Sequence, residues 1–333
     1  MSVNRQFLLQ ARPEGPIKHS DFKLFEGALP EINEGEVLVQ VLLVALEPAM
    51  KGWMEARVDY VAPMQIGDVM RGRGLGRVIE SDNTAFPEGT LVMGGFGWQE
   101  YAASRGVDLT ILPEGITPEA AMNVLGITGL TAYFGMMDIG KPEAGETVLV
   151  SGAAGATGSV AGQLAHLSGA RVVGIAGGRV KCDWLVDDLG FAGAIDYKAG
   201  ELAEQLKALA PDGVNVFFDN VGGDILDLGL ENIADRARVV LCGGISRYNE
   251  TGPLAGPKNY FNLIYRRARM EGFIVIDYAK RFPEASSYLV DHLRSGELKH
   301  HETVLDGFEQ LPQALMDLFT GGNIGKQLVR VAD

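Results

Sequence analysis

The sequence predicts an α/β protein of two domains, a small β-barrel followed by a doubly wound parallel sheet. The chain has 333 residues, more than one hydrophobic core usually serves. Up to about residue 120, short apolar runs alternate with glycine-rich turns, which is typical of a small barrel. From about residue 146, apolar runs alternate with helical patterns, which indicates a parallel sheet with helices on both faces.

Composition and charge exclude several classes of partner. The formal net charge is -14, so we expect neither nucleic acid nor an anionic membrane as a partner. The two cysteines, Cys182 and Cys242, form no C-x-x-C pair, which argues against a disulfide framework and for a reducing compartment. No apolar run approaches the roughly 18 residues of a membrane span, and the N-terminus does not resemble a signal peptide. We therefore expect a cytoplasmic protein.

The barrel domain is expected to contain a long strand over 36–46 and two strands with a turn over 89–104. Helical patterning begins over 118–140, where Pro118 suits a helix start. After residue 310 the chain reads as one helix and one terminal strand, which we expect to pack back on the barrel. The predicted domains are therefore 1–122 with 299–333, and 123–298.

The second domain is expected to contain six strands connected by amphipathic helices. The expected strands are 146–150, 171–177, 192–198, 214–223, 237–244 and 270–278. The expected helices are 157–168, 181–190, 201–210 and 224–233, followed by a last amphipathic helix over 281–298.

A glycine turn joins the first of these strands to its helix, in the stretch "LVSGAAGATGSVAGQLAHL". The dinucleotide fingerprint is G-x-G-x-x-G, and Ala153, Gly155 and Gly158 stand at its three glycine positions. The second glycine lets backbone N–H groups approach a pyrophosphate, and the third lets helix and strand pack closely. The alternative is an ordinary tight turn, but the surrounding strand–helix alternation favours a nucleotide site.

The second strand ends without the carboxylate that usually contacts the ribose 2′-OH of NAD. Gly177 and Gly178 stand there, and Arg179 and Lys181 follow at once. Two cations without an acid suit a 2′-phosphate, so we expect NADPH; the alternative is a solvated basic turn.

No metal site is expected. The five histidines are not spaced with cysteine or glutamate as the three ligands of a catalytic zinc, and two cysteines cannot make a four-cysteine structural site. Any carbonyl in the substrate must then be polarised without a metal.

Several motifs together resemble the zinc-independent medium-chain dehydrogenase/reductases, in the leukotriene B4 dehydrogenase/prostaglandin reductase branch with its curcumin and alkenal reductases. The motifs are "SGAAGATGSVAGQLAHLSGARVVGIAG", "FFDNVGG", "CGGISRYNETGP", "GGNIGKQLV" and "LEPAMKGWM". The resemblance covers essentially the whole chain. It implies a GroES-like barrel, a Rossmann domain, and NADPH-dependent reduction of the C=C bond of α,β-unsaturated aldehydes or ketones.

The resemblance also implies roles for individual residues. Tyr265 would face the substrate carbonyl, and Tyr248 is the alternative donor. The cofactor-binding residues would be Gly155, Ala156, Thr157, Gly158, Arg179, Lys181, Tyr197, Asn220, Cys242, Gly243, Gly244, Ile245, Ser246, Phe273, Ile274, Val275 and Asn323.

The sequence departs from the family pattern near its N-terminus. Pro48, Ala49 and Met50 stand where many members carry a Pro-Tyr pair, so a pocket-lining aromatic is missing there, and Tyr60 is a candidate replacement. Substrate size is thereby left open.

In the implied reaction, hydride reaches the β-carbon, and a tyrosine hydroxyl with the ribose 2′-OH stabilises charge on the carbonyl oxygen. Two alternatives stay open, a zinc-independent quinone oxidoreductase and a non-enzymatic NADPH-binding protein. The apolar strand expected over 270–278 at the sheet edge predicts a homodimer.

Overall fold

The computed structural model describes residues 3–56 and 60–332 and divides into two units. The first unit contains Met1–Met122 and Glu302–Asp333, and the second contains Asn123–His301. The sequence placed the domain boundaries after residues 122 and 298. None of the helices in the described part of the chain has the length and apolar character needed to cross a membrane.

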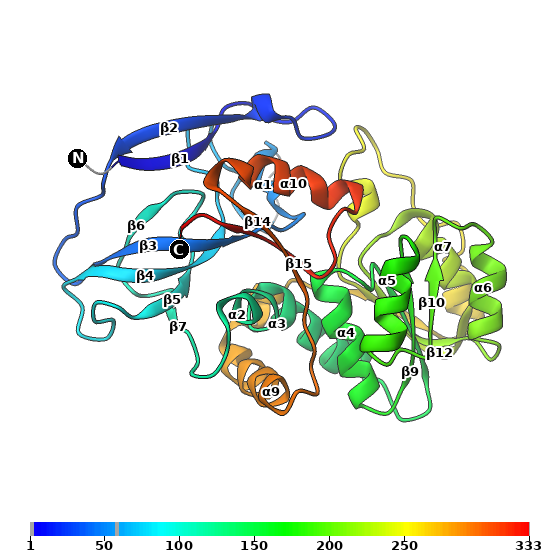
Figure 1. The fold of residues 1–333 in the computed structure, drawn as a ribbon. Coiled ribbons are helices and arrows are strands. Elements are labelled where there is room, and N and C mark those ends of the chain that lie inside the picture. Colours follow the sequence, from blue (N-terminus) through cyan, green and yellow to red (C-terminus); the bar gives the residue numbers. More distant parts are fainter. Residues whose placement is uncertain (1–2, 57–59, 333) are drawn as a thin grey trace. The chain divides into compact units, whose positions relative to one another are not determined.

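The first unit, here called the barrel unit, is a curved and mainly antiparallel sheet (Figure 1). Its strands are β1 (Val3–Leu9), β2 (Phe22–Ala28), β3 (Val37–Ala45), β4 (Arg73–Ser81), β5 (Leu91–Gly94), β6 (Tyr101–Ser104), β7 (Thr110–Ile111), β14 (Glu302–Asp306) and β15 (Lys326–Arg330). The main sheet has the order β14-β15-β3-β4-β5-β7, with β6 also paired to β3. The helices are η1 (His19–Asp21), α1 (Met50–Met54), α2 (Pro118–Asn123), η6 (Phe308–Gln310) and α10 (Leu311–Thr320).

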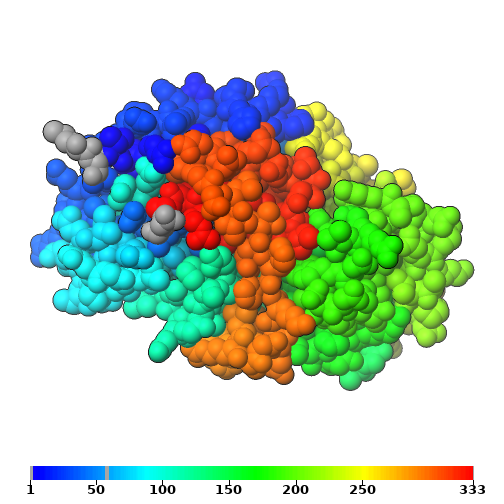
Figure 2. Space-filling model, viewed as in Figure 1, coloured from blue at the N-terminus to red at the C-terminus, as the bar shows by residue number. Residues whose placement is uncertain are grey.

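Strand β1 closes this unit by hydrogen bonding to two other segments as well as to β2. The Phe7 N–H donates to the Trp98 carbonyl at 2.9 Å, and the Leu9 N–H donates to the Asp68 carbonyl at 2.9 Å. Phe7 then stacks on Phe308 with ring centroids 5.2 Å apart. The C-terminal segment therefore packs against the N-terminal hairpin within this unit, as Figure 2 shows in orange and blue.

The second unit, here called the sheet unit, has six parallel strands. They are β8 (Thr147–Ser151), β9 (Arg171–Ala176), β10 (Gly193–Asp196), β11 (Val214–Asp219), β12 (Ile233–Leu241) and β13 (Arg269–Gly272). Their order, β10-β9-β8-β11-β12-β13, reverses direction between β8 and β11, which is the switch point at which doubly wound sheets bind ligands.

Helices connect these strands on both faces. They are α3 (Ile127–Tyr133), η2 (Phe134–Gly140), α4 (Ala156–Leu167), α5 (Arg179–Asp183), η3 (Trp184–Asp188), α6 (Leu202–Leu209), α7 (Gly223–Glu231), η4 (Ile245–Arg247), α8 (Asn262–Tyr265), η5 (Val275–Arg281) and α9 (Phe282–Ser295). Leu206 of α6 and Leu230 of α7 share a core with Phe217 of the sheet. The connections β8–α4–β9 and β11–α7–β12 run in opposite directions along the sheet. Because both crossovers are right-handed, α4 lies on the opposite face of the sheet from α7. The predicted fold class is confirmed.

The last predicted strand is wrong over most of its length. The sequence predicts a strand over 270–278, but β13 ends at Gly272 and the 3-10 segment η5 follows. The Phe273 ring meets Tyr278 edge-on at 6.3 Å, and Tyr278 stacks on Phe134 at 4.5 Å. These apolar side chains therefore turn the chain onto the sheet unit's own helices instead of extending its edge.

A buried ion pair joins the two ends of the barrel unit. Lys326 of β15 and Glu47, which follows β3, are both almost inaccessible, and Nζ lies 3.1 Å from Oε1. Replacing Lys326 by methionine leaves the Glu47 charge buried without its partner, which typically costs about 3–5 kcal/mol. Lys326→Met should therefore lower the free energy of unfolding of this unit by about that amount. Urea unfolding followed by the fluorescence of Trp53 and Trp98 measures it.

Arg330, four residues further along β15, provides the matched control. It pairs with Asp306 and Glu119 at 3.2 Å but is 40% exposed, so Arg330→Met should cost less than about 1 kcal/mol. Equal losses in the two variants would contradict a special role for the buried pair.

Candidate active site

The turn between β8 and α4 is shaped for close backbone contact. Gly152 adopts φ +57°, and the Gly155 N–H donates to its carbonyl at 3.0 Å. A Cβ on Gly158 would lie 2.3 Å from that same carbonyl oxygen, so this position tolerates no side chain. The first intrahelical bond is from Ser159 N–H to Gly155, which leaves the preceding N–H groups of the first turn available to an anion.

Gly152 is a site residue that the fingerprint comparison did not identify. The fingerprint placed Ala153 at the first glycine position, but Ala153 is fully buried and its N–H donates to the Ile175 carbonyl at 3.0 Å. The left-handed residue that makes the tight turn stands one position earlier. A glycine directly after an apolar strand was the available signal.

A buried carboxylate, Asp219, holds the carboxyl ends of β8 and β11. Its side chain accepts hydrogen bonds from Ser151 Oγ at 2.6 Å and from the N–H groups of Val221 at 3.1 Å and Gly222 at 3.0 Å. Burial raises the pKa of Asp219, and the three hydrogen bonds oppose that rise. This residue precedes Asn220 in "FFDNVGG" and was missed because the motif drew attention only to the asparagine.

Asn220 is oriented by the same arrangement. Its N–H donates to Ser151 Oγ at 2.8 Å, and its Nδ2 donates to the Ser151 carbonyl at 2.7 Å. The Asn220 carbonyl accepts from the Ile245 N–H at 3.2 Å, and the Asp219 carbonyl accepts from the Cys242 N–H at 2.9 Å. The ends of β8, β11 and β12 are thus connected by hydrogen bonds.

The loop after β12 carries Cys242, Gly243, Gly244, Ile245 and Ser246, and it ends at Tyr248. Ser246 Oγ donates to the Val221 carbonyl at 2.7 Å, which fixes the loop beside β11. The Tyr248 hydroxyl folds back to within 3.5 Å of the Gly244 nitrogen. This hydroxyl therefore lies at the same sheet edge as Gly155 and Asn220.

Cys242 is not a nucleophile in this arrangement. Burial, with a smaller effect of the Asp219 charge, raises the pKa of its thiol to about 12. The thiol stays protonated at neutral pH, and only the thiolate is reactive.

A second cluster, here called the basic corner, lies at the ends of β9 and β10. A Cβ on Gly177 would lie 2.7 Å from the Tyr197 ring, so the ring rests on this glycine. Burial lowers the pKa of Lys181, and the neighbouring Lys198 charge lowers it further. Lys198 Nζ is 5.9 Å from the Tyr197 ring centroid. Lys198 was not predicted, although it directly follows Tyr197 in the sequence.

Arg179 differs from Lys181. Its side chain is 91% exposed and pairs with Asp183 at 3.4 Å on the same short helix. A second carboxylate of this region, Asp196, accepts the Gly178 and Lys198 N–H groups at 2.8 and 2.9 Å through Oδ1. These backbone bonds lower the pKa of Asp196.

Phe273, Ile274 and Val275 follow the carboxyl end of β13. The Phe273 ring does not face outward at that edge. A Cβ on Gly135 would lie 2.7 Å from its Cζ, so the ring packs on η2. Within the described structure, only the backbone of this segment and the partly buried Ile274 and Val275 stand at the sheet edge.

Tyr265 lies at the opposite end of the sheet. Asn262, one turn earlier, donates to the Leu230 carbonyl at 3.1 Å, and the Arg266 carbonyl accepts the Arg236 N–H at 2.6 Å, both at the amino end of β12. The four residues from Arg238 to Cys242 alone correspond to roughly 13 Å of strand. Tyr265 was expected to face the substrate carbonyl, and this position lies at the other end of the sheet from Gly155 and Asn220.

The remaining predicted residues belong to the barrel unit. Asn323 Nδ2 donates to the Gly325 carbonyl at 2.8 Å in the turn between α10 and β15. Met50 is fully buried in the core of this unit, so it is not a surface substitute for the missing aromatic, whereas Tyr60 is exposed. Across the described residues, no group of three His, Cys, Asp or Glu side chains is arranged to hold a metal ion.

Two protein families match the chain. The family described as N-terminal domain of oxidoreductase matches residues 5–112, and the one described as zinc-binding dehydrogenase matches residues 156–291. A Bacillus subtilis (strain 168) protein provisionally named as an NADP-dependent oxidoreductase, YfmJ, is 43% identical over 99% of this chain and 98% of its own. The NADPH-dependent curcumin reductase of Escherichia coli (strain K12) is 37% identical over 99% and 97%.

Solved structures agree with these relatives. The crystal structure of CurA from Vibrio vulnificus in complex with NADPH has a TM-score of 0.93 and 37% identity, and covers 99% of both chains. The chain therefore belongs to the medium-chain dehydrogenase/reductase family, in its zinc-independent branch.

Proposed function

We propose that this chain is an NADPH-dependent reductase of the C=C bond of α,β-unsaturated aldehydes or ketones. One observation carries the proposal: the glycine turn, the basic corner and the Tyr248 hydroxyl all stand at the carboxyl edge of one parallel sheet. The names of the curcumin reductase and of the CurA–NADPH complex support both the cofactor and the substrate class.

The residues present fit a phosphorylated dinucleotide. The turn at Gly152, Gly155 and Gly158 leaves no room for a Cβ on Gly158 and offers the free N–H groups of Ala156 and Thr157 to a pyrophosphate. In the basic corner, Lys181, Lys198 and Tyr197 would hold a 2′-phosphate, with Arg179 at its exposed rim. Asn220 and the loop from Cys242 to Ser246 would lie along the nicotinamide half, as would Ile274, Val275 and the backbone of Phe273.

Bound NADPH would supply the hydride that adds to the β-carbon of the enone. Negative charge then develops on the carbonyl oxygen, and a hydrogen bond placed there stabilises the transition state more than the ground state. We assign this donor to the Tyr248 hydroxyl, since Tyr248 shares the sheet edge with the nucleotide turn and Tyr265 does not. The protein contributes position and electrostatics, and the hydride chemistry belongs to the cofactor.

The basic corner predicts a preference for NADPH over NADH. Lys181→Ala should raise KM for NADPH by about 10-fold or more, because a hydrogen bond to a charged group is lost. KM for NADH should change less than about twofold, since NADH has no 2′-phosphate for the lysine to bind. Steady-state kinetics with both cofactors measures the effect.

Arg179→Ala is the matched control for this experiment. Arg179 is exposed and already paired with Asp183, so its loss should raise KM for NADPH much less than the loss of Lys181. An equal rise in KM for both cofactors in Lys181→Ala would mean that the lysine supports the fold of the site and not the phosphate.

The placement of Tyr248 predicts a selective loss of turnover. Tyr248→Phe should lower kcat/KM for a 2-alkenal by about 10- to 1,000-fold, as for the loss of one oxyanion donor. KM for NADPH should hardly change, because the phenol would face the substrate. NADPH oxidation measured with enones of graded length tests the variant and the substrate class together.

Tyr265→Phe is the control, and it should keep full activity per active site. If Tyr265→Phe is crippled while Tyr248→Phe is not, the assignment is wrong. If the wild-type protein reduces a quinone and leaves every enone untouched, the quinone oxidoreductase reading replaces the proposal. Tight NADPH binding with no turnover of either substrate would favour a non-enzymatic role.

We also propose that the chain forms a homodimer through the segment that precedes β13. Five large apolar or aromatic side chains of this segment are exposed to solvent, namely Leu254, Tyr260, Phe261, Ile264 and Tyr265. Next to them, β13 has no partner on its outer side among the described strands. An apolar patch beside an unpaired edge strand is typical of an interface between copies.

We predict that a charged residue placed in this apolar patch disrupts the dimer. Ile264 is 65% exposed, so Ile264→Asp should fold normally but shift the mass in light scattering from dimer to monomer. Val107→Asp is the control, because Val107 is 93% exposed in the barrel unit, away from this segment in the sequence and in a different unit. A monomeric wild-type protein at micromolar concentration would overturn the dimer.

A further inference from the structure

A cationic pocket of about 350 Å³ lies at the amino end of the parallel sheet. Its lining residues are Lys141, Glu143, Arg236, Ala237, Arg238, Arg267 and Arg269. Lys141 follows η2, Arg236, Ala237 and Arg238 belong to β12, and Arg269 is the first residue of β13. The pocket is therefore at the edge opposite to the nucleotide turn, and the proposed reduction does not use it.

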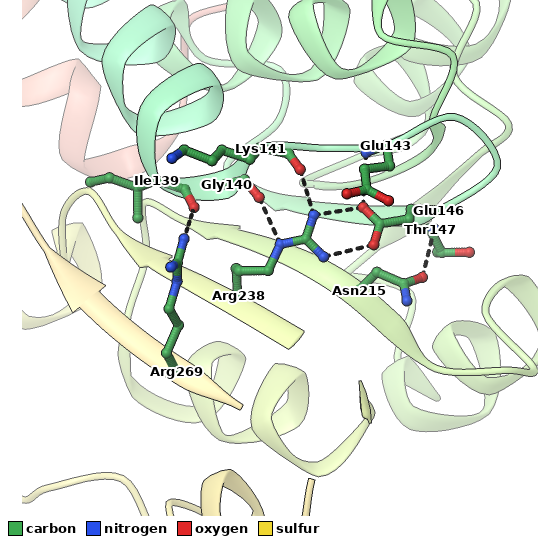
Figure 3. Close-up of polar contacts among 9 residues, drawn as sticks. All are labelled: Ile139, Gly140, Lys141, Glu143, Glu146, Thr147, Asn215, Arg238 and Arg269. Atoms are coloured by element: carbon green, nitrogen blue, oxygen red, sulfur yellow. Dashed lines mark hydrogen bonds and ion pairs between the residues drawn. The ribbon is translucent and has the colours of Figure 1, made fainter. Parts of the chain in front are cut away.

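Two of these cations hold the fold together. Arg238 donates to the Gly140 carbonyl at 2.8 Å and binds the Glu146 carboxylate with both terminal nitrogens, at 2.7 and 2.6 Å (Figure 3). Arg269 donates to the Ile139 carbonyl at 2.6 Å. Both arginines cap the carboxyl end of η2, where unpaired carbonyls and the helix dipole favour a cation.

The other three cationic residues have a left-handed backbone conformation. Lys141, Arg236 and Arg267 have φ of +46°, +61° and +51°. In the described part of the chain, Glu201 is the one further non-glycine residue with positive φ. This left-handed conformation is unfavourable for L side chains and favours glycine. Three long cationic side chains at such positions in one pocket indicate that their charges are needed there.

The pocket also keeps an excess of positive charge. Lys141 and Arg236 form no ion pair with any residue that the structure describes, and Arg267 shares Asp235 with Arg266. Six cationic side chains surround the pocket, namely Lys141, Arg236, Arg238, Arg266, Arg267 and Arg269. Four carboxylates accompany them, namely Glu143, Glu146, Asp235 and Glu271. Such an excess stands out in a chain whose net charge is -14.

We propose that this pocket binds the pyrophosphate group of a small polyphosphate through Lys141, Arg236 and Arg267. Guanidinium groups bind phosphate oxygens in pairs, and a lysine adds a point charge. The volume suits a small ligand, and no aromatic side chain lines the pocket, so recognition rests on the phosphates and not on a base.

The test must keep pyrophosphate away from the nucleotide turn. The full-length protein is therefore saturated with NADP⁺ and titrated with inorganic pyrophosphate in a calorimeter. One further site per chain should appear, with sulfate at equal ionic strength binding at least about 10-fold more weakly, since it offers fewer charged contacts. If ATP binds more tightly than pyrophosphate, the ligand of the pocket is a nucleotide. If the two affinities are equal, the ligand is a free polyphosphate.

Glycine substitutions remove the charges without straining the backbone. Arg236→Gly and Lys141→Gly should each weaken pyrophosphate binding by about 10-fold or more, because a charged contact is lost. Their melting temperatures should stay within about 3 °C of wild type, because glycine accepts the left-handed conformation. Glu201→Gly is the matched control, since it relieves the same conformation outside the pocket, and it should leave the affinity unchanged.

Three results would overturn the proposal. One is that NADP⁺-saturated wild-type protein binds no pyrophosphate at millimolar concentration. Another is that both pocket variants bind as tightly as wild type, or no more weakly than Glu201→Gly. The third is that the pocket variants change the oligomeric state in light scattering without any effect of pyrophosphate, which would assign these cations to a contact between copies.

Discussion

The candidate site depends on one buried carboxylate. Asp219 has no access to solvent, yet three donors and its own backbone carbonyl connect it to β8, to the turn after β11 and to the loop after β12. The loop after β11 carries Asn220, and the loop after β12 carries Tyr248. Removing a charge from water is costly, so the carboxylate is stable only while all of its donors are in place. Any change that loosens one of the three strand ends therefore loosens the others.

The sheet unit presents cations at both of its ends. Lys181 and Lys198 stand at the carboxyl edge, and Lys141 and Arg236 stand at the amino edge. The rest of the chain is strongly acidic, so these clusters are local maxima in an otherwise negative field. Small anions that diffuse near the surface are drawn to such maxima and repelled elsewhere.

Local patterns predicted most of the sheet unit. The strand–helix alternation located five strands, because buried parallel strands are continuous apolar runs. It was wrong after Gly272, where apolar side chains were read as a strand although Phe273 and Tyr278 pack on helices of the same unit. In the barrel unit, β1, β2, β4, β7 and β14 were not predicted; of these, β2, β7 and β14 bury few side chains and so give little apolar pattern.

The candidate site was predictable where a motif is local and not where it depends on distant contacts. Gly155 and Gly158 follow from the fingerprint, but Asp219 matters through Ser151, which is 68 positions away. The role of Tyr265 was taken from the family resemblance. Sequence distance does not say at which end of a strand a residue lies, and this residue lies at the amino end.

The barrel unit has a consequence for the order of events during synthesis. Strand β15 pairs with β3, and Lys326 meets Glu47 across 279 positions, so this unit is not complete until the last residues of the chain are available. The sheet unit is one continuous segment, Asn123–His301, so all of its strand pairings are available once that segment has been made. On a ribosome the sheet unit can therefore fold first, while the N-terminal strands wait with an open edge. The barrel strands are thus the part of the chain with the greatest need of protection from aggregation before the C-terminus emerges.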